Sequence, residues 1–127
     1  MKSRDTALRL RRFEADDKAR KVADLEHMIR DFETMAADLE RQIQAEEERT
    51  GIRDATHFAY STFAKSAAQR RDNLRSSASE LLQKLEAAQR ELEDALEQLS
   101  RTTPAQPARD EHRNRRRTER ANGAALR

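Results

Sequence analysis

Residues 43–60 read IQAEEERTGIRDATHFAY, and this stretch interrupts two long segments that share one apolar repeat. In both segments, apolar residues recur at alternating steps of three and four, as the seam of a coiled coil requires. The seam runs through Val22, Leu25, Ile29, Phe32, Ala36, Leu39 and Ile43, and then through Tyr60, Ala64, Ala67, Leu74, Ala78, Leu81, Leu85, Ala88, Leu92, Ala95 and Leu99. The pattern predicts two long helices that each bury one face.

The break between the two segments predicts a turn. Four successive seam positions in it are polar: Glu46, Thr50, Arg53 and His57. Gly51 lies among them, where glycine costs a helix about 1 kcal/mol relative to alanine and supplies the left-handed backbone that often ends a helix. Either Asp54 or Ser61 is suited to cap the next helix by accepting a backbone hydrogen bond.

We therefore expect an all-α protein, an antiparallel two-helix coiled-coil hairpin in residues 1–102. The first helix should cover about residues 4–49, the turn residues 50–56, and the second helix about residues 57–101. Pro104 and Pro107 should end the second helix, because proline lacks an amide donor. Residues 103–127 should form a disordered basic tail, because the Arg-rich run at 113–117 has no apolar partner.

The composition limits the classes of protein to consider. Charged residues make up 39% of the 127 residues, there is no Trp and no Cys, and the mean hydropathy is −1.11. Such a chain has little material for a globular core. Neither an export signal nor an apolar run of about 20 residues is found, so a cytoplasmic protein is expected. Residues 101–127 carry eight Arg against three acidic residues, a net +5, which leaves −3 on residues 1–100.

Apolar side chains also flank the seam. Met28 and Met35 flank it in the first segment, and Leu82 and Leu96 flank it in the second. They either shield the edge of the seam or form a strip on which a third surface docks. An acidic stripe at heptad spacing, Glu26, Glu33, Glu40 and Glu47, is interpreted as a solvated face.

Both ends of the expected rod depart from the repeat and are candidates for partner binding. At the terminal end, Leu8 follows the seam, whereas Leu10 and Phe13 lie outside it, and they mix with Arg9, Arg11 and Arg12. This end is either a basic and apolar contact surface or a frayed helix terminus. At the turn end, Phe58, Tyr60 and Phe63 lie within six residues. These aromatic residues either plug the end of the rod or form an exposed interface.

Catalysis is not expected. The three histidines are far apart in sequence, and no Cys is present to act as a nucleophile. A rod gives paired carboxylates no cleft in which to shift their pKa values. With only two glycines there is no phosphate-binding loop, and no metal-ligand spacing is found. We expect no enzyme activity, cofactor, metal ion or small-molecule substrate.

Three parts of the sequence resemble a compact form of the flagellar export protein FliJ family. They are residues 1–12, residues 23–47, and above all residues 50–74, which contain Thr50-Gly51-Ile52-Arg53-Asp54, His57-Phe58-Ala59-Tyr60 and Gln69-Arg70-Arg71-Asp72-Asn73. The resemblance covers roughly residues 1–100. It implies an antiparallel coiled coil in the cytoplasmic part of the flagellar type III export apparatus, peripheral to the inner membrane.

The resemblance also implies partners. Members of the family act as a stalk that contacts the ring of the export ATPase and the cytoplasmic domain of the export gate, and they help to handle substrate chaperones. Carried onto this chain, the terminal end with Leu8, Leu10 and Phe13 becomes the candidate contact for the ATPase. The turn end with Phe58, Tyr60 and Phe63 becomes the candidate contact for the gate.

Two other interpretations stay open on the sequence alone. The register is unbroken across residue 51, so a continuous parallel homodimer acting as a scaffold is compatible with the seam. The Arg-rich tail could neutralise phosphates of a nucleic acid. The nucleic-acid interpretation is the weaker one, because residues 1–100 are acidic and the tail has no interleaved aromatic residues.

Overall fold

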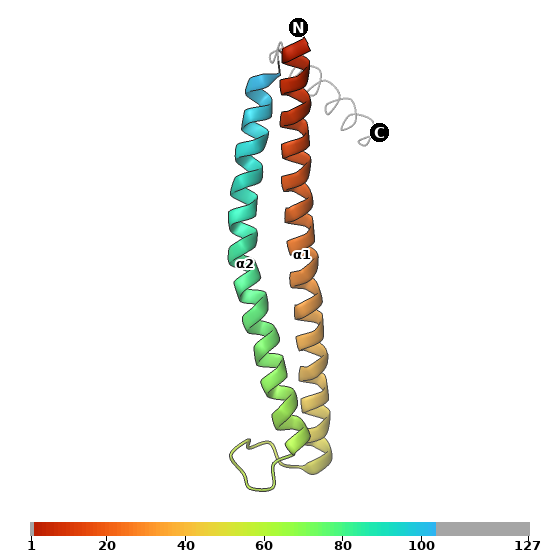
Figure 1. The fold of residues 1–127 in the computed structure, drawn as a ribbon. Coiled ribbons are helices and arrows are strands. Elements are labelled where there is room, and N and C mark those ends of the chain that lie inside the picture. Colours follow the sequence, from red (N-terminus) through yellow and green to blue (C-terminus); the bar gives the residue numbers. More distant parts are fainter. Residues whose placement is uncertain (1, 104–127) are drawn as a thin grey trace, which may run out of the picture.

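The computed structural model describes residues 2–103 and consists of two long helices that lie side by side (Figure 1). Helix α1 spans Lys2–Thr50 and helix α2 spans Thr62–Thr102. The start of α1 and the end of α2 lie at the same end of the molecule, so the helices are antiparallel. At 1.5 Å per residue, α1 is roughly 70 Å long. The expected all-α helical hairpin is confirmed, and the chain folds back instead of continuing as one parallel rod.

The buried core is a single row of side chains between the two helices. Helix α1 buries residues at strict heptad spacing, and α2 buries mostly alanines. The buried residues are Ala15, Val22, Ile29, Ala36 and Ile43 on α1, and Ala64, Ala67, Ala78, Leu81, Ala88 and Ala95 on α2. Ala15 extends the α1 row one heptad beyond the expected seam. Small residues on α2 allow the helices to approach closely, so the rod is slim.

The remaining seam residues are half-buried and border this row. They are Leu25, Phe32 and Leu39 on α1 and Leu74, Leu85, Leu92 and Leu99 on α2. One seam position holds a charge, because Arg71 falls between Ala67 and Leu74 in the repeat. Its guanidinium lies 2.6 Å from Glu40 on α1 and also contacts Asp72. The charge is therefore neutralised by an ion pair that joins the two helices.

The boundaries differ from the sequence prediction at the turn. Helix α1 is slightly longer than expected, and α2 begins at Thr62 instead of about residue 57. Residues 51–61 form an ordered loop in place of the expected turn at 50–56. Ser61, not Asp54, caps α2 by accepting a hydrogen bond from the Ala64 amide at 3.2 Å. The expected tail beyond Thr103 lies outside the described residues.

Hydrogen bonds within the loop explain why α2 starts late. Asp54 accepts from the amide of Thr56 at 2.9 Å and from its hydroxyl at 2.7 Å. The amide of His57 bonds to the carbonyl of Asp54, and the amide of Tyr60 bonds to the carbonyl of His57, both at 3.1 Å. The Asp54 carboxylate is therefore occupied by hydrogen bonds within the loop, and Ser61 caps α2 instead.

Gly51 ends α1 with the backbone angle φ at +73°, and its amide still donates to the carbonyl of Glu47 at 2.8 Å. A side chain at this position meets no atom within 4 Å, so only the backbone conformation opposes substitution. We expect Gly51→Ala to lower the free energy of unfolding by about 1 kcal/mol, because a left-handed conformation disfavours residues with a Cβ atom. Thermal denaturation followed by circular dichroism measures this. Gly51→Asn should lower the free energy of unfolding by less, because asparagine adopts the left-handed conformation more readily than alanine. Equal losses of stability in the two variants would contradict this explanation.

Candidate functional site

The two helices divide the surface of the rod into two long faces, which are identified by ion pairs between the helices. Lys21 lies 3.6 Å from Glu91, and both residues directly precede a seam residue. Glu40 lies 3.7 Å from Arg75, and both directly follow a seam residue. Residues that directly precede the seam positions in phase with Val22 and Leu92 therefore share one face. Residues that directly follow the seam positions in phase with Leu39 and Leu74 share the other.

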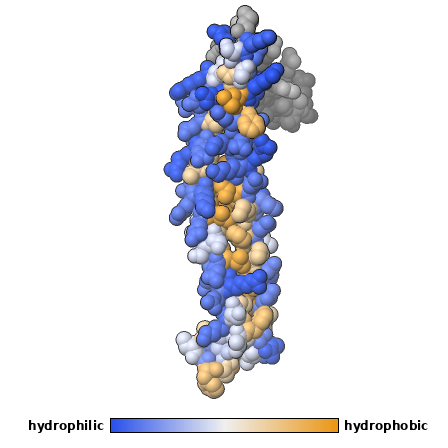
Figure 2. All heavy atoms as spheres, in the orientation of Figure 1, coloured by the Kyte–Doolittle hydropathy of each residue, from blue (hydrophilic) through white to orange (hydrophobic). Residues whose placement is uncertain are grey.

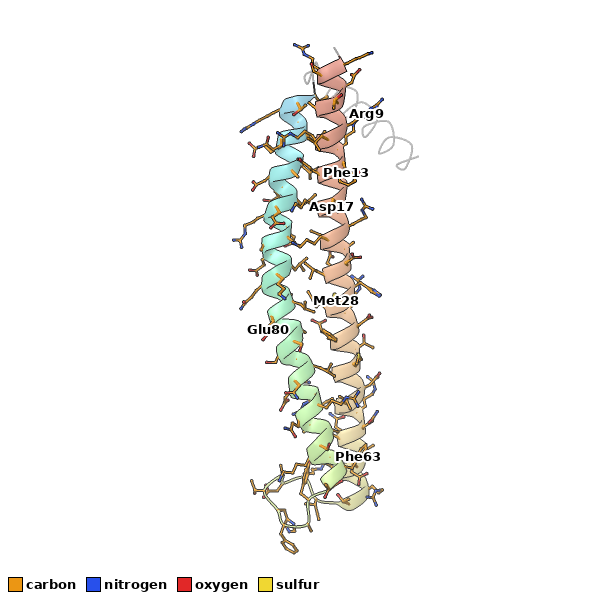
Figure 3. All side chains as sticks on the ribbon, viewed as in Figure 1. Arg9, Phe13, Asp17, Met28, Phe63 and Glu80 are labelled. Atoms are coloured by element: carbon orange, nitrogen blue, oxygen red, sulfur yellow. The ribbon has the colours of Figure 1, made fainter. Side chains whose placement is uncertain are left out.

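We call the first of these the methionine face. It carries Lys21, Met28 and Met35 from α1 and Phe63, Arg70, Ser77, Lys84 and Glu91 from α2. Met28, Met35 and Phe63 are all exposed large apolar residues. Figure 3 labels Met28 on α1 and Phe63 near the start of α2, and Figure 2 shows apolar atoms in a band along the middle of the rod.

The opposite face is called the glutamate face. It carries Glu26, Glu33, Glu40 and Glu47 from α1, and Arg75, Leu82 and Leu96 from α2. Part of the expected acidic stripe is not simply solvated. Glu40 pairs with Arg71, and Glu47 accepts a hydrogen bond from the Tyr60 hydroxyl at 3.1 Å. The hydrogen bond to Glu40 raises the pKa of Arg71, against the desolvation that lowers it, so the seam charge is permanent.

The three aromatic residues of the turn end have different environments. Tyr60 packs against the core cluster of Ile43, Ala64 and Ala67, and its burial raises the pKa of the phenol. Phe58 is 96% exposed and stacks on the His57 ring, with 4.7 Å between ring centroids. Phe63 is about half exposed. Tyr60 thus plugs the end of the rod, while Phe58 and Phe63 are available to a partner.

Phe58 is held at the tip by an ordered backbone. The amide of Ala59 donates to Nδ1 of His57 at 3.0 Å, which requires the neutral ring to carry its proton on Nε2. Two backbone hydrogen bonds close one turn that ends just before Phe58 and a second turn, residues 57–60, that contains it. An aromatic side chain on a preorganised loop suits insertion into a partner, because little conformational entropy is lost on binding.

Two glutamates at the end of α1 hold the loop in place. Glu46 accepts from the Ser61 hydroxyl at 3.1 Å, and Glu47 accepts from Tyr60. Ser61 thus donates to α1 through its proton and caps α2 through its oxygen. The polar seam position at Glu46, expected only to interrupt packing, forms a hydrogen-bonded connection between the helices.

The pKa of Glu46 is lowered chiefly by its hydrogen bond from Arg49, with a further contribution from Ser61. A carboxyl group with a lowered pKa stabilises the fold above about pH 4.5, the ordinary value, and this contribution is lost as the pH falls through the lower folded value. We expect the melting temperature to fall with acidification below pH 4.5, and to fall less steeply in Glu46→Gln. Melting curves between pH 6 and pH 3 test this, and identical slopes would contradict it.

The terminal end presents apolar residues away from the core. Leu10 is 54% exposed and Phe13 is 63% exposed, whereas Leu8 is half-buried. Arg9 and Arg12 are exposed beside them, while Arg11 is half-buried and forms an ion pair with Glu14 at 3.1 Å. Phe13 and Arg9 are labelled near the start of α1 in Figure 3. Residues 8–13 thus form a basic, partly apolar surface. Leu10 and Phe13 are its exposed apolar side chains.

Several further features of residues 2–103 concern metal sites, cavities and membrane spans. Over residues 2–103, no group of three or more His, Asp or Glu side chains is placed to hold a metal ion. A shallow depression on α1, lined by Asp17, Arg20, Lys21, Asp24 and Leu25, is open to solvent. Neither described helix is long and apolar enough to cross a membrane. The Arg-rich run proposed for nucleic acid lies outside the described residues.

Comparisons of the chain with models of protein families, with curated proteins and with solved structures find no match.

Proposed function

We propose that this protein is a non-enzymatic component of the flagellar type III protein export apparatus. It acts as a stalk that contacts the ring of the export ATPase and the export gate and assists delivery of substrates and chaperones. It works in the cytoplasm at the base of the flagellum. The proposal is supported by the resemblance of residues 1–12, 23–47 and 50–74 to the FliJ family.

The observation that carries the proposal is the placement of exposed apolar side chains at both ends of a slim rod. Leu10 and Phe13 are exposed among arginines at one end, and Phe58 is almost fully exposed at the other. Exposed aromatic residues close to arginines are common at protein interfaces. A rod with a contact surface at each end is suited to connect two partners that lie far apart.

The mechanism follows from the asymmetry of the rod. Inside a ring, a two-helix rod presents different side chains to each surrounding subunit, here a methionine face on one side and a glutamate face on the other. It therefore binds different ring states with different affinity, and this difference shifts the equilibrium between them. Alanines at the core of α2, such as Ala64 and Ala88, keep the rod thin enough for a narrow bore.

The test is ATP hydrolysis by the export ATPase of the same organism, measured with and without the full-length protein. We expect the protein alone to hydrolyse no ATP and to raise the turnover of the oligomeric ATPase. A matched control is heat-unfolded protein at the same concentration. Unchanged ATP turnover, together with no detectable binding to the ATPase, would overturn the proposal.

For the gate, we expect Phe58→Ser to weaken binding of the cytoplasmic gate domain by about tenfold, because a fully exposed ring becomes buried in the complex. Isothermal titration calorimetry measures the affinity. Phe58 contacts no core residue, so the variant should melt at the temperature of the wild type. A matched control is Met35→Ser in the middle of the rod, which should leave gate binding unchanged. Equal affinity of Phe58→Ser and wild type would exclude the tip as the gate contact.

A further inference from the structure

The charge of this chain is divided along its length. Residues 2–13 of α1 carry five basic side chains against one acidic side chain, Asp5, a net +4. Residues 101–127 begin at the end of α2, beside the start of α1, and carry a net +5. The whole chain has a net charge of +2, which leaves −7 on residues 14–100. The positive charge therefore belongs to the terminal end, and the rest of the rod is acidic.

Four of the five basic side chains in the first turns of α1 are exposed and have no ion-pair partner among residues 2–103. They are Lys2, Arg4, Arg9 and Arg12. The fifth, Arg11, is half-buried and pairs with Glu14 at 3.1 Å. Exposed cations that no neighbouring carboxylate neutralises attract anionic partners and raise the rate of association with them. The terminal end is thus an electrostatic contact surface for a negatively charged partner.

Two large apolar side chains lie among these cations. Leu10 is one helical turn before Phe13, and Arg9 directly precedes Leu10, so the three share one side of α1. This side points away from the core, because Leu10 and Phe13 are 54% and 63% exposed whereas Ala15 is 5% exposed. Figure 3 labels Arg9 and Phe13 on these first turns. The partner must therefore offer both negative charge and an apolar environment.

We propose that the terminal end binds the surface of an anionic phospholipid membrane. The basic side chains contact the phosphates of the head groups, because a negative membrane surface attracts clusters of four or more Lys and Arg residues. Leu10 and Phe13 insert between the head groups, where an apolar side chain needs no matching pocket. A nucleic acid would attract the same cations, but its phosphate backbone offers Leu10 no apolar contact. This inference does not rest on the proposed function.

The charge distribution also sets the orientation of the bound rod. The rod is roughly 70 Å long, whereas salt screens charges over about 8 Å at physiological ionic strength. The membrane therefore attracts the terminal end and repels the acidic remainder, beginning with the exposed Asp16 and Asp17 directly after the basic turns. The rod projects from the surface, and Phe58 at the turn end lies away from the lipid. Leu10 and Phe13 are also the proposed ATPase contact, so a membrane-bound rod does not bind the ATPase at the same time.

Cosedimentation of the full-length protein with vesicles tests the charges. We expect binding to vesicles of phosphatidylglycerol and phosphatidylcholine in equal parts, none to pure phosphatidylcholine, and weaker binding as salt is added. The double variant Arg9→Glu, Arg12→Glu should bind the anionic vesicles about tenfold more weakly or worse. The matched control Arg30→Glu, Arg53→Glu changes the net charge equally at exposed positions nearer the turn and should lose far less. No binding to anionic vesicles, or equal losses in the two double variants, would overturn the proposal.

Tryptophan reporters test the apolar contact and the orientation, because the chain has no Trp of its own. In Phe13→Trp, anionic vesicles should shift the fluorescence emission to shorter wavelength, since the indole leaves water. In Phe58→Trp, the emission should not shift. Both positions are exposed, so the fold should be unchanged, and circular dichroism checks this. An unshifted Phe13→Trp would leave charge alone as the attraction, as expected for a nucleic acid, and equal shifts would mean that the rod lies flat. Either result would overturn the proposal.

Discussion

Replacing Ile43 with alanine is expected to lower the free energy of unfolding by about 2–4 kcal/mol, the range found for large-to-small changes in buried cores. Ile43 is 4% exposed and is the only large member of the buried cluster that it forms with Ala64 and Ala67. Its buried neighbours are alanines, and the two larger side chains packed against the cluster, Leu39 and Tyr60, are already half-buried, so the space left by the isoleucine is at most partly filled. Small domains are only marginally stable, so this loss is a large fraction of the total.

Urea denaturation followed by circular dichroism measures this effect. The matched control is Leu82→Ala, which removes a similar volume from a side chain that is 45% exposed. We expect the control to cost less than about 1 kcal/mol, because much of that side chain already contacts water. Comparable losses in the two variants would mean that the row of buried side chains does not dominate the stability.

The double variant Leu10→Ser, Phe13→Ser is expected to weaken binding to the export ATPase by a factor of ten or more, on the order of 1.4 kcal/mol or above. Both side chains are more than half exposed, so the hairpin should keep its stability when they are replaced. Two apolar side chains buried in a complex contribute more than this factor. Leu8 is left unchanged because it is half-buried and its replacement would also affect packing.

Surface plasmon resonance with immobilised ATPase measures the affinity. Leu96→Ser is the matched control, since Leu96 is similarly exposed and lies near the same end on α2. It should bind like the wild type. An unchanged affinity of the double variant would remove the terminal end as the ATPase contact and leave the rest of the rod to be tested.

The helical hairpin could be predicted because the heptad repeat, the polar gap and Gly51 all favour the same fold. The repeat did not indicate how unequally the two helices contribute. On α1 the buried row includes Val22 and Ile29, whereas on α2 most buried positions are alanines. A series of apolar positions does not distinguish a fully buried alanine from a half-buried leucine, because burial depends on which residue lies opposite.

Two features of the candidate sites could not be read from the sequence. Arg71 breaks the apolar repeat, and only the antiparallel register brings Glu40 beside it. The three turn aromatics form one group in sequence, yet the loop turns Tyr60 into the core and Phe58 away from it. In both cases the deciding contact joins residues of different helices or of loop and helix, which no local pattern specifies.

The hydrogen bonds that Glu46 and Glu47 accept from the loop have a consequence for local opening of the rod. Carboxylates in the last turn of a helix oppose its dipole, so this turn of α1 depends on the hydrogen bonds from Ser61 and Tyr60. When the loop detaches, α1 loses these hydrogen bonds, and Ser61, the residue that caps α2, loses its contact with α1. The amide protons on both sides of the loop should then exchange with solvent together, as one cooperative unit distinct from the middle of the rod. A partner that binds Phe58 should therefore slow amide exchange in two helices at once.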